Sequence, residues 1–292
     1  MTATQTQPGT HRPADRGAVA ARLGRARHTR LVIRKVTAVN IRAILEYRGD
    51  TAVWILFGIL WQTSTLIFAA VLITRFNGLG GWPSIGVVLI AGMRLLSHGF
   101  YVLIFYNFGT LPQLIDEGRF DGYFLRPVPI FTQLLLSSFS ANAFGDLLVA
   151  FTLCAVALPQ IAIHWTLGKA LFLLAGVISG TLIEASIQLI VACSVLRSPG
   201  TRAVPAFIDE MFGTFGNYPL TILPGVLQGV FTFVLPLAFV AYFPVSVVLH
   251  LTPHNAFLSF LAHVSPLVGL LLFLLARWIW KRSLRNYASV GG

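Results

Sequence analysis

Four ionisable residues stand inside long apolar runs of this sequence: Arg94, His98, Asp146 and Glu184. Arg94 and His98 are four positions apart, so both would lie on one face of a helix. A charge inside a membrane is costly unless it is paired or hydrated, which makes such residues functional candidates. These side chains could line a polar substrate path, form a structural ion pair of Arg94 with Asp146 or Glu184, or relay protons.

Motifs of catalytic chemistry are absent from the sequence. It contains no G-x-x-x-x-G-K-[ST] loop for phosphates, no H-E-x-x-H, no Cys/His metal spacing and no G-x-S-x-G elbow. His250, His254 and His263 could bind a metal, but no carboxylate or cysteine accompanies them, so we interpret them as structural. We expect a protein that is not an enzyme and binds no nucleotide, cofactor or metal of its own. Cys154 and Cys193 stand in apolar runs and are expected in the core.

The segment 110–130, GTLPQLIDEGRFDGYFLRPVP, is a charged loop between two apolar runs, bounded by Pro112 and Pro127. Its charged residues are Asp116, Glu117, Arg119, Asp121 and Arg126. Its large apolar residues are Leu111, Leu114, Ile115, Phe120, Tyr123, Phe124 and Leu125. A solvated turn explains the charges alone. A short helix that docks into a groove on a soluble partner explains both sets, and we favour it.

The composition places these residues in a membrane protein. The chain has 292 residues, of which 56% are hydrophobic and 11% charged, whereas soluble domains carry about 25% charged residues. A spanning helix needs roughly 20 apolar residues. The long continuous runs predict an all-α integral membrane protein rather than a barrel. Six runs qualify, at about 52–74, 85–108, 131–158, 169–195, 221–245 and 262–280.

The distribution of basic residues predicts the orientation of the chain. The formal net charge is +11, and ten of the 21 Lys and Arg residues fall within residues 1–50. With both termini inside, 18 basic residues are cytoplasmic, while Arg75 and Lys169 are outside and Arg94 is within a span. This asymmetry follows the positive-inside rule and argues against nucleic-acid binding. We therefore expect a bacterial-type plasma membrane protein with cytoplasmic termini and membrane lipids as partners.

Segments outside the spans complete the predicted organisation. Residues 1–30 are polar and Arg-rich and predict a disordered cytoplasmic tail. Residues 31–50 predict an amphipathic helix along the inner membrane face, followed by a six-helix domain over 51–287. The stretch 196–220 predicts a second membrane-surface helix, and 244–262 predicts a long outer connection. The fifth run predicts a kinked helix, either ordinary in its packing or able to hinge at Pro219, Pro224, Pro236 and Pro244.

Two segments resemble a known family. EGRFDGYFLRPV (117–128) resembles a Gly-to-Asp-to-Arg-Pro pattern of permease subunits in ABC-2-type transporters, most closely the six-span subfamily linked to viologen-type or multidrug export. NYPLTILPGVLQGVFTFVLPLAFVAYFPV (217–245) resembles the Tyr-Pro, "PLAF" and aromatic-Pro elements of that group. The resemblance runs from about residue 31 to 287.

The resemblance implies a division of labour. Two permease chains, identical or related, would form an export pathway for drugs or other xenobiotics. Two separate ATPase subunits would bind ATP and Mg²⁺ in the cytoplasm. The charged loop would be the coupling helix that contacts them. The residues that would serve coupling are Leu114, Asp116, Glu117, Arg119, Phe120, Asp121, Arg126 and Pro127.

An alternative function is a proton-coupled secondary transporter that uses Arg94, His98, Asp146 and Glu184. Inverted repeats with broken helices would favour this function, and the sequence shows no such symmetry across its six runs. An intramembrane enzyme would need a nucleophile with its base, or a metal set, and neither is visible. Dependence on ATP rather than on a proton gradient separates the exporter from the secondary transporter.

Overall fold

The computed structural model describes residues 31–287 apart from positions 32, 43, 138, 197–202, 254 and 286. These residues form helices and one two-stranded hairpin, in which Leu79 pairs with Trp82. The elements are α2 (Arg48–Trp61), α3 (Thr63–Arg75), β1 (Gly78–Leu79), β2 (Trp82–Pro83), α4 (Ser84–Phe105), η1 (Tyr106–Phe108), α5 (Leu111–Asp116), η2 (Asp121–Tyr123), α6 (Ile130–Leu136), α7 (Asn142–Gln160), α8 (Leu167–Val195), α9 (Val204–Phe215), η4 (Leu220–Ile222), α10 (Gly225–Gly229), η5 (Val230–Val234), η6 (Leu237–Phe239), α11 (Tyr242–Val248) and α12 (Ala256–Arg285).

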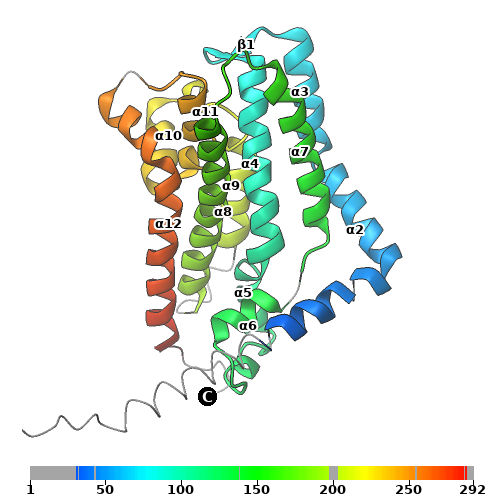
Figure 1. Ribbon diagram of the computed structural model, residues 1–292. Helices are drawn as coiled ribbons and strands as arrows, with labels where there is room; N and C mark the ends of the chain where they lie inside the picture. The colour runs from blue at the N-terminus through cyan, green and yellow to red at the C-terminus, as the bar shows by residue number, and fades with distance from the viewer. Residues whose placement is uncertain are drawn as a thin grey trace, which may run out of the picture.

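Five helical segments of the described chain are long and apolar enough to cross a membrane: Arg48–Arg75, Ser84–Asp116, Asn142–Gln160, Leu167–Val195 and Ala256–Arg285. Figure 1 shows them side by side, with the β1 hairpin at one end of the bundle and α5 and α6 at the other. We call these the β1 end and the α5 end. The prediction of an all-α membrane protein is therefore confirmed.

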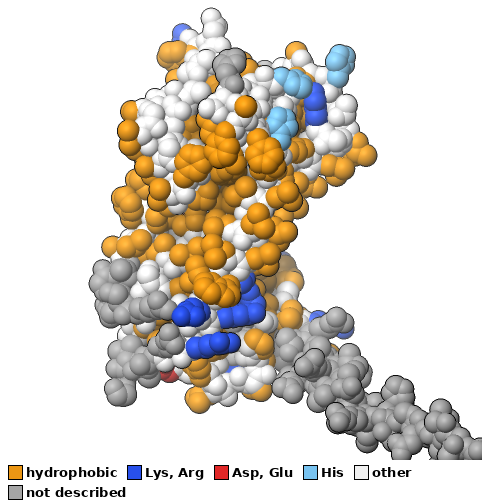
Figure 2. All heavy atoms as spheres, turned by 90° about the vertical axis from the view of Figure 1, so that its left-hand side faces the viewer, with side chains coloured by type: hydrophobic (Ala, Val, Ile, Leu, Met, Phe, Trp, Pro, Cys, Tyr) orange, Lys and Arg blue, Asp and Glu red, His pale blue; other side chains and the backbone are white. Residues whose placement is uncertain are grey.

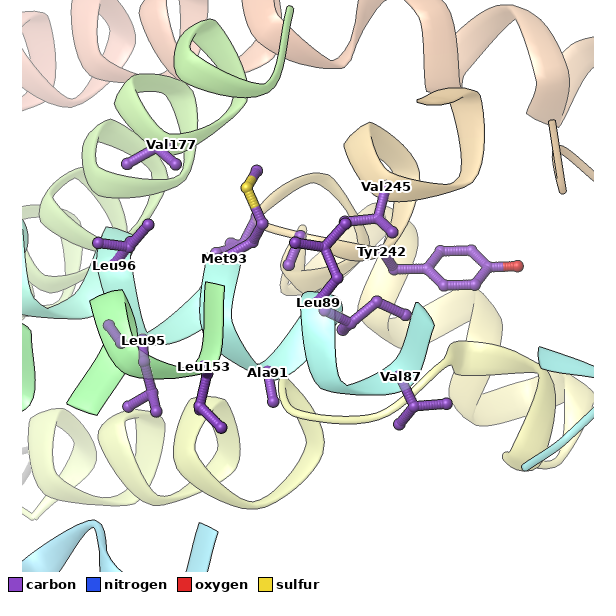
Figure 3. Packing of buried hydrophobic residues seen from close by; sticks show 14 of the residues in the cluster. Val87, Leu89, Ala91, Met93, Leu95, Leu96, Leu153, Val177, Tyr242 and Val245 are labelled. Carbon is purple, nitrogen blue, oxygen red and sulfur yellow. The ribbon is translucent and has the colours of Figure 1, made fainter. Parts of the chain in front are cut away.

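Helix α4 lies at the centre of the bundle and supplies most of the core. Nearly every residue from Gly86 to Ser97 is buried. Figure 3 shows Met93 and Leu96 on the side of α4 that meets Val177, and Leu95 and Ala91 on the side that meets Leu153. Its hydrophobic residues occur all around the helix, as expected for an element enclosed by neighbours on every side.

Glycine allows α2 and α7 to approach closely. A Cβ atom on Gly145 would lie 2.4 Å from the carbonyl oxygen of Ile55, and one on Gly58 would lie 2.5 Å from that of Asn142. Such contacts between small residues are a main source of helix association in membranes, where water does not drive apolar side chains together.

The predicted fifth span over 221–245 is wrong as a single helix. This range contains η4, α10, the π-helical η5, η6 and the start of α11, and Pro219, Pro224 and Pro236 stand directly before η4, α10 and η6. Proline lacks an N–H group and clashes with the preceding turn, so these short elements end where prolines occur. Pro244 differs, because it lies within α11 and packs near Gly176 of α8.

Helix α9 and η4 instead lead the chain from the α5 end to the β1 end. Gln188 of α8 donates hydrogen bonds to Pro205 and Asp209 near the start of α9. Thr221 of η4 donates a 2.8 Å hydrogen bond to the carbonyl of Gly80 in the hairpin. Helix α9, within the predicted surface helix of 196–220, buries Pro205, Ile208 and Phe212 against the bundle and leaves its other side exposed. Its position at a membrane surface stays a prediction. The predicted outer connection over 244–262 contains most of α11 and the start of α12.

Two further expectations concern the α5 end. The predicted third span over 131–158 is split into α6 and α7, and the long helix begins only at Asn142. The described residues between 31 and 46 are helical, and this helix runs across the axis of the bundle in Figure 1. Its position at a membrane surface stays a prediction. The predicted tail over 1–30 lies outside the described residues.

The two cysteines and the histidines are candidate core or metal-binding residues. Cys154 and Cys193 are both buried, as expected for core residues. Lys169 Nζ lies 3.4 Å from His250 Nε2, and His254 lies outside the described residues. Within the part of the chain that the structure describes, no group of three or more His, Cys, Asp or Glu residues could hold a metal ion.

Candidate functional site

A buried ionic cluster joins α4 to α8. Glu184 lies 3.0 Å from His98 Nδ1 and 3.9 Å from Arg94 Nε, and only 3% of the Arg94 and Glu184 side chains is exposed. Because Arg94 and His98 are one turn apart on α4, one carboxylate on α8 reaches both. Of the two partners that the sequence left open for Arg94, the structure brings Glu184 within ion-pair distance.

Asp146 is a further buried ionisable residue in this polar region, with a hydrogen-bond partner of its own. Its Oδ1 accepts a 3.1 Å hydrogen bond from Gln62 Nε2, and both side chains are buried. Gln62 stands at the break between α2 and α3, with a backbone φ of −86° and ψ of 0°. Asp146 therefore contacts the helix break rather than Arg94, although all four predicted residues lie in the same part of the bundle.

A cavity of about 730 Å³ opens onto this region between the α2–α3 break, α4 and α9. Two of the predicted pathway residues, Arg94 and His98, line it. The other lining residues are Trp61, Gln62, Ser64, Thr65, Phe68, Ala206, Asp209, Glu210, Gly213, Thr214, Asn217 and Tyr218. The cavity combines charged groups with aromatic rings and so suits an amphiphilic ligand.

Sequence reasoning missed the contribution of α9 to this cavity. The sequence places Asp209 and Glu210 beside a helical stripe of Phe207, Met211, Phe212 and Phe215, a pattern that predicts a membrane-surface helix. Their position beside a run of aromatic and glycine residues was the available signal. The fold brings them to the same cavity as Arg94 and His98.

Several buried atoms of this region have no hydrogen-bond partner among the described residues. They are Arg94 Nε, Glu184 Oε1, Gln188 Oε1 and Asn217 Oδ1. Buried polar atoms normally find a partner, so water or a ligand in the cavity would satisfy them. This chemistry supports binding and hydrogen bonding, and it contains no nucleophile paired with a base.

The charged loop (residues 110–130) has an exposed polar tip at the α5 end. Arg119 Nη1 donates a 2.9 Å hydrogen bond to Glu117 Oε2, and both residues are exposed. Hydrogen bonds from Arg119 and Gln113 lower the pKa of Glu117 below its ordinary value. Gly118, with φ +66°, makes the turn between them, a conformation that glycine adopts readily. The tip is therefore an ordered, charged surface.

An aromatic anchor attaches the loop to the end of α12. Phe120 is fully buried, and its ring lies edge-on to Trp280 of α12 and to Tyr287, at 6.5 and 5.2 Å between ring centroids. Tyr287 also stacks on Phe124 and donates a 3.1 Å hydrogen bond to Asp121. Phe120 thus holds the loop in place and is not part of its open surface, and its role in coupling stays a prediction.

The remaining loop residues that are predicted to serve coupling differ in their exposure. Asp116, Arg126 and Pro127 are exposed, whereas Leu114 is half-buried. The Arg126 guanidinium lies 5.9 Å from the centroid of the Tyr123 ring. Leu125 is 87% exposed, so the open surface of the loop combines charges with an apolar side chain. This mixture is typical of a protein-binding surface.

Comparison with known proteins identifies the family of the chain. A family model described as "ABC-2 family transporter protein" matches residues 59–291, which is more than half of the sequence. The chain belongs to the ABC-2 transporter family. No match to it was found among curated proteins or among solved structures.

Membership in the ABC-2 family assigns the chain to the membrane component of a transporter. Such a permease is the transport component and is not itself catalytic. The matched range contains both the cavity and the charged loop. The resemblance seen in segments 117–128 and 217–245 is thereby confirmed at the level of the family.

Proposed function

We propose that this ABC-2 permease exports amphiphilic drugs or other xenobiotics, driven by a separate ATPase that contacts the charged loop. The observation that carries the proposal is the physical link between loop and cavity. Leu111, Ile115 and Phe120 of the loop share one hydrophobic cluster with Ala185 and Leu189 of α8. These α8 residues stand beside Glu184, so displacement of the loop would shift the ionic cluster.

The active unit in this proposal contains two permease chains and two ATPase subunits. ATP and Mg²⁺ bind to the ATPases, and the permease contributes no nucleotide site. The cavity supports a second permease chain, because the carboxylates of Asp209 and Glu210 that line it would be costly to place against lipid. A partner chain, identical or related, would enclose them around a hydrated path.

The first test is purification of the permease in mild detergent with identification of proteins that accompany it. We expect a P-loop ATPase in stoichiometric amount, and ATP-dependent transport when both are placed in vesicles. A permease that stays alone after cross-linking in native membranes would overturn the proposal. Transport that follows a proton gradient without ATP would favour the secondary transporter based on Arg94, His98, Asp146 and Glu184.

A charge exchange tests the loop contact more closely. Glu117→Arg removes the pair with Arg119, whereas Glu117→Arg combined with Arg119→Glu restores a local pair with reversed polarity. If the loop tip recognises an ATPase, both variants should lose most coupling of ATP hydrolysis to transport while remaining in the membrane. Recovery in the double variant would show that only the local ion pair matters. We leave Asp121 unchanged in this design, because it also holds Tyr287.

A further inference from the structure

The last turns of α12 carry a cluster of basic residues. They are Arg277, Lys281, Arg282 and Arg285. Figure 2 views the side of the molecule formed by α12, and Lys and Arg side chains gather there below a broad apolar band. None of the four forms an ion pair with a described acidic residue. This cluster is separate from the polar cavity, to which α12 contributes no residue.

Arg277 has an unusual environment within this cluster. Its guanidinium carbon lies 3.5 Å from the centroid of the Phe131 ring, a close cation–π contact that fixes its orientation. Its Nη1 is buried and has no hydrogen-bond acceptor among the residues that the structure describes. A guanidinium carries five N–H donors, and a buried donor without an acceptor is unfavourable. The side chain as a whole is half-buried, so the rest of the guanidinium can still reach an acceptor at the surface.

On the helix face of Arg277, one neighbour is basic and could bind a phospholipid headgroup, and two are apolar and could contact an acyl chain. Lys281 follows one turn later on the same face and is exposed. Leu274 and Leu270 precede Arg277 by three and seven positions on that face, and they are 57% and 49% exposed. A headgroup at Arg277 and Lys281 would therefore have its acyl chain along Leu274 and Leu270, towards the middle of the bundle.

We infer that this face of α12 binds an anionic phospholipid, with Arg277 and Lys281 on its phosphate. Arginine binds phosphate oxygens through hydrogen bonds, and the half-buried Arg277 side chain leaves part of its guanidinium open to a phosphate. The site lies where the apolar part of α12 ends and the basic residues begin, which is the depth of lipid headgroups. The inference does not depend on the transported substrate or on an ATPase.

Lipid binding to the purified, delipidated full chain tests this site by native mass spectrometry. The probes are phosphatidylglycerol, phosphatidylcholine and diacylglycerol with identical acyl chains. We expect the wild type to retain phosphatidylglycerol best and diacylglycerol least. Arg277→Gln should weaken phosphatidylglycerol binding roughly tenfold, as expected for loss of a charge-assisted hydrogen bond. Arg277→Lys keeps the charge without the planar fork and should be intermediate.

Arg282→Gln is the matched control, because it removes the same charge from another side of α12. It should change phosphatidylglycerol binding less than twofold, as expected for an exposed charge outside the site. Equal losses in Arg277→Gln and Arg282→Gln would show diffuse attraction to the basic end and overturn the site. Equal retention of the three lipids by the wild type would also overturn it, even if Arg277→Gln fails to fold.

Discussion

The four ionisable side chains that the sequence predicts within the spans contact specific neighbours in the structure. Arg94 and His98 share Glu184, while Asp146 accepts from Gln62. If one member of a buried ion pair is removed, the other charge is left without a partner in a medium of low polarity. Such an unpaired buried charge is strongly destabilising. The sequence placed Arg94 and His98 on one face by their spacing, but the choice of Glu184 required the packing of α8 against α4.

Glu184→Gln is predicted to destabilise the permease. The variant leaves Arg94 buried without an anionic partner, and loss of one member of a buried pair costs about 3–5 kcal/mol. Thermal unfolding in detergent should show a clear drop in midpoint. Glu210→Gln is the control, since Glu210 is exposed and its described contact is with Thr214. Equal midpoints for the two variants would contradict a stabilising role for the cluster.

The contact of Tyr287 with Asp121 should depend on pH. Burial and the hydrogen bond to Asp121 raise the pKa of Tyr287 to about 12, from an ordinary value of about 10. The folded protein favours the neutral phenol, so the contact stabilises below about pH 10 and is lost as pH rises towards 12. The difference in thermal stability between wild type and Tyr287→Phe should shrink over this range. A difference that stays constant to pH 12 would refute this linkage.

At the scale of elements, the charged loop and the end of α12 behave as one unit. Residues that are distant in sequence, Phe120, Trp280 and Tyr287, form a single aromatic group. The loop therefore has an inner side that holds its position and an outer side available to a partner. A buried apolar residue in such a loop holds the loop in place, and an exposed one is available to a partner. Phe120 is buried, whereas Leu125 is 87% exposed.

Loosening this anchor should expose the loop to protease. Phe120→Ala removes a fully buried ring, a change that costs about 3–5 kcal/mol in a packed core. Trypsin should then cleave after Arg119 several times faster than in the wild type, as followed by mass spectrometry, whereas Pro127 protects the bond after Arg126. Leu125→Ala is the control and should leave the cleavage rate unchanged. Equal rates in Phe120→Ala and wild type would show that Phe120 does not hold the loop.

At the scale of the whole molecule, polar and basic features separate between the two ends of the bundle. The charged loop, the helix before α2 and the basic end of α12 lie at the α5 end, and the short hairpin lies at the β1 end (Figure 1). This agrees with the orientation that the positive-inside rule predicts, with the α5 end in the cytoplasm.

Cysteine labelling of intact cells tests this orientation. The two natural cysteines are buried, so an introduced thiol should dominate the signal. A membrane-impermeant maleimide should label Asn77→Cys, beside the hairpin, and should label Leu125→Cys only after the membrane is opened. Both positions are exposed in the structure. Labelling of Leu125→Cys alone in intact cells would mean that the orientation is reversed.

By itself, the sequence determined that the chain is a helical membrane protein and that it has a charged loop. Its motifs also pointed to a transporter family. Hydropathy, charge distribution and short motifs are local properties, so they can be recognised without knowing which residues are in contact. The tertiary structure decided which segments cross the bundle. The run 221–245 is apolar enough for a span, yet its prolines divide it into short elements, and α9 packs against the bundle. Pairing of Glu184 with His98 and burial of Phe120 also depend on residues far away in sequence, which local patterns do not encode.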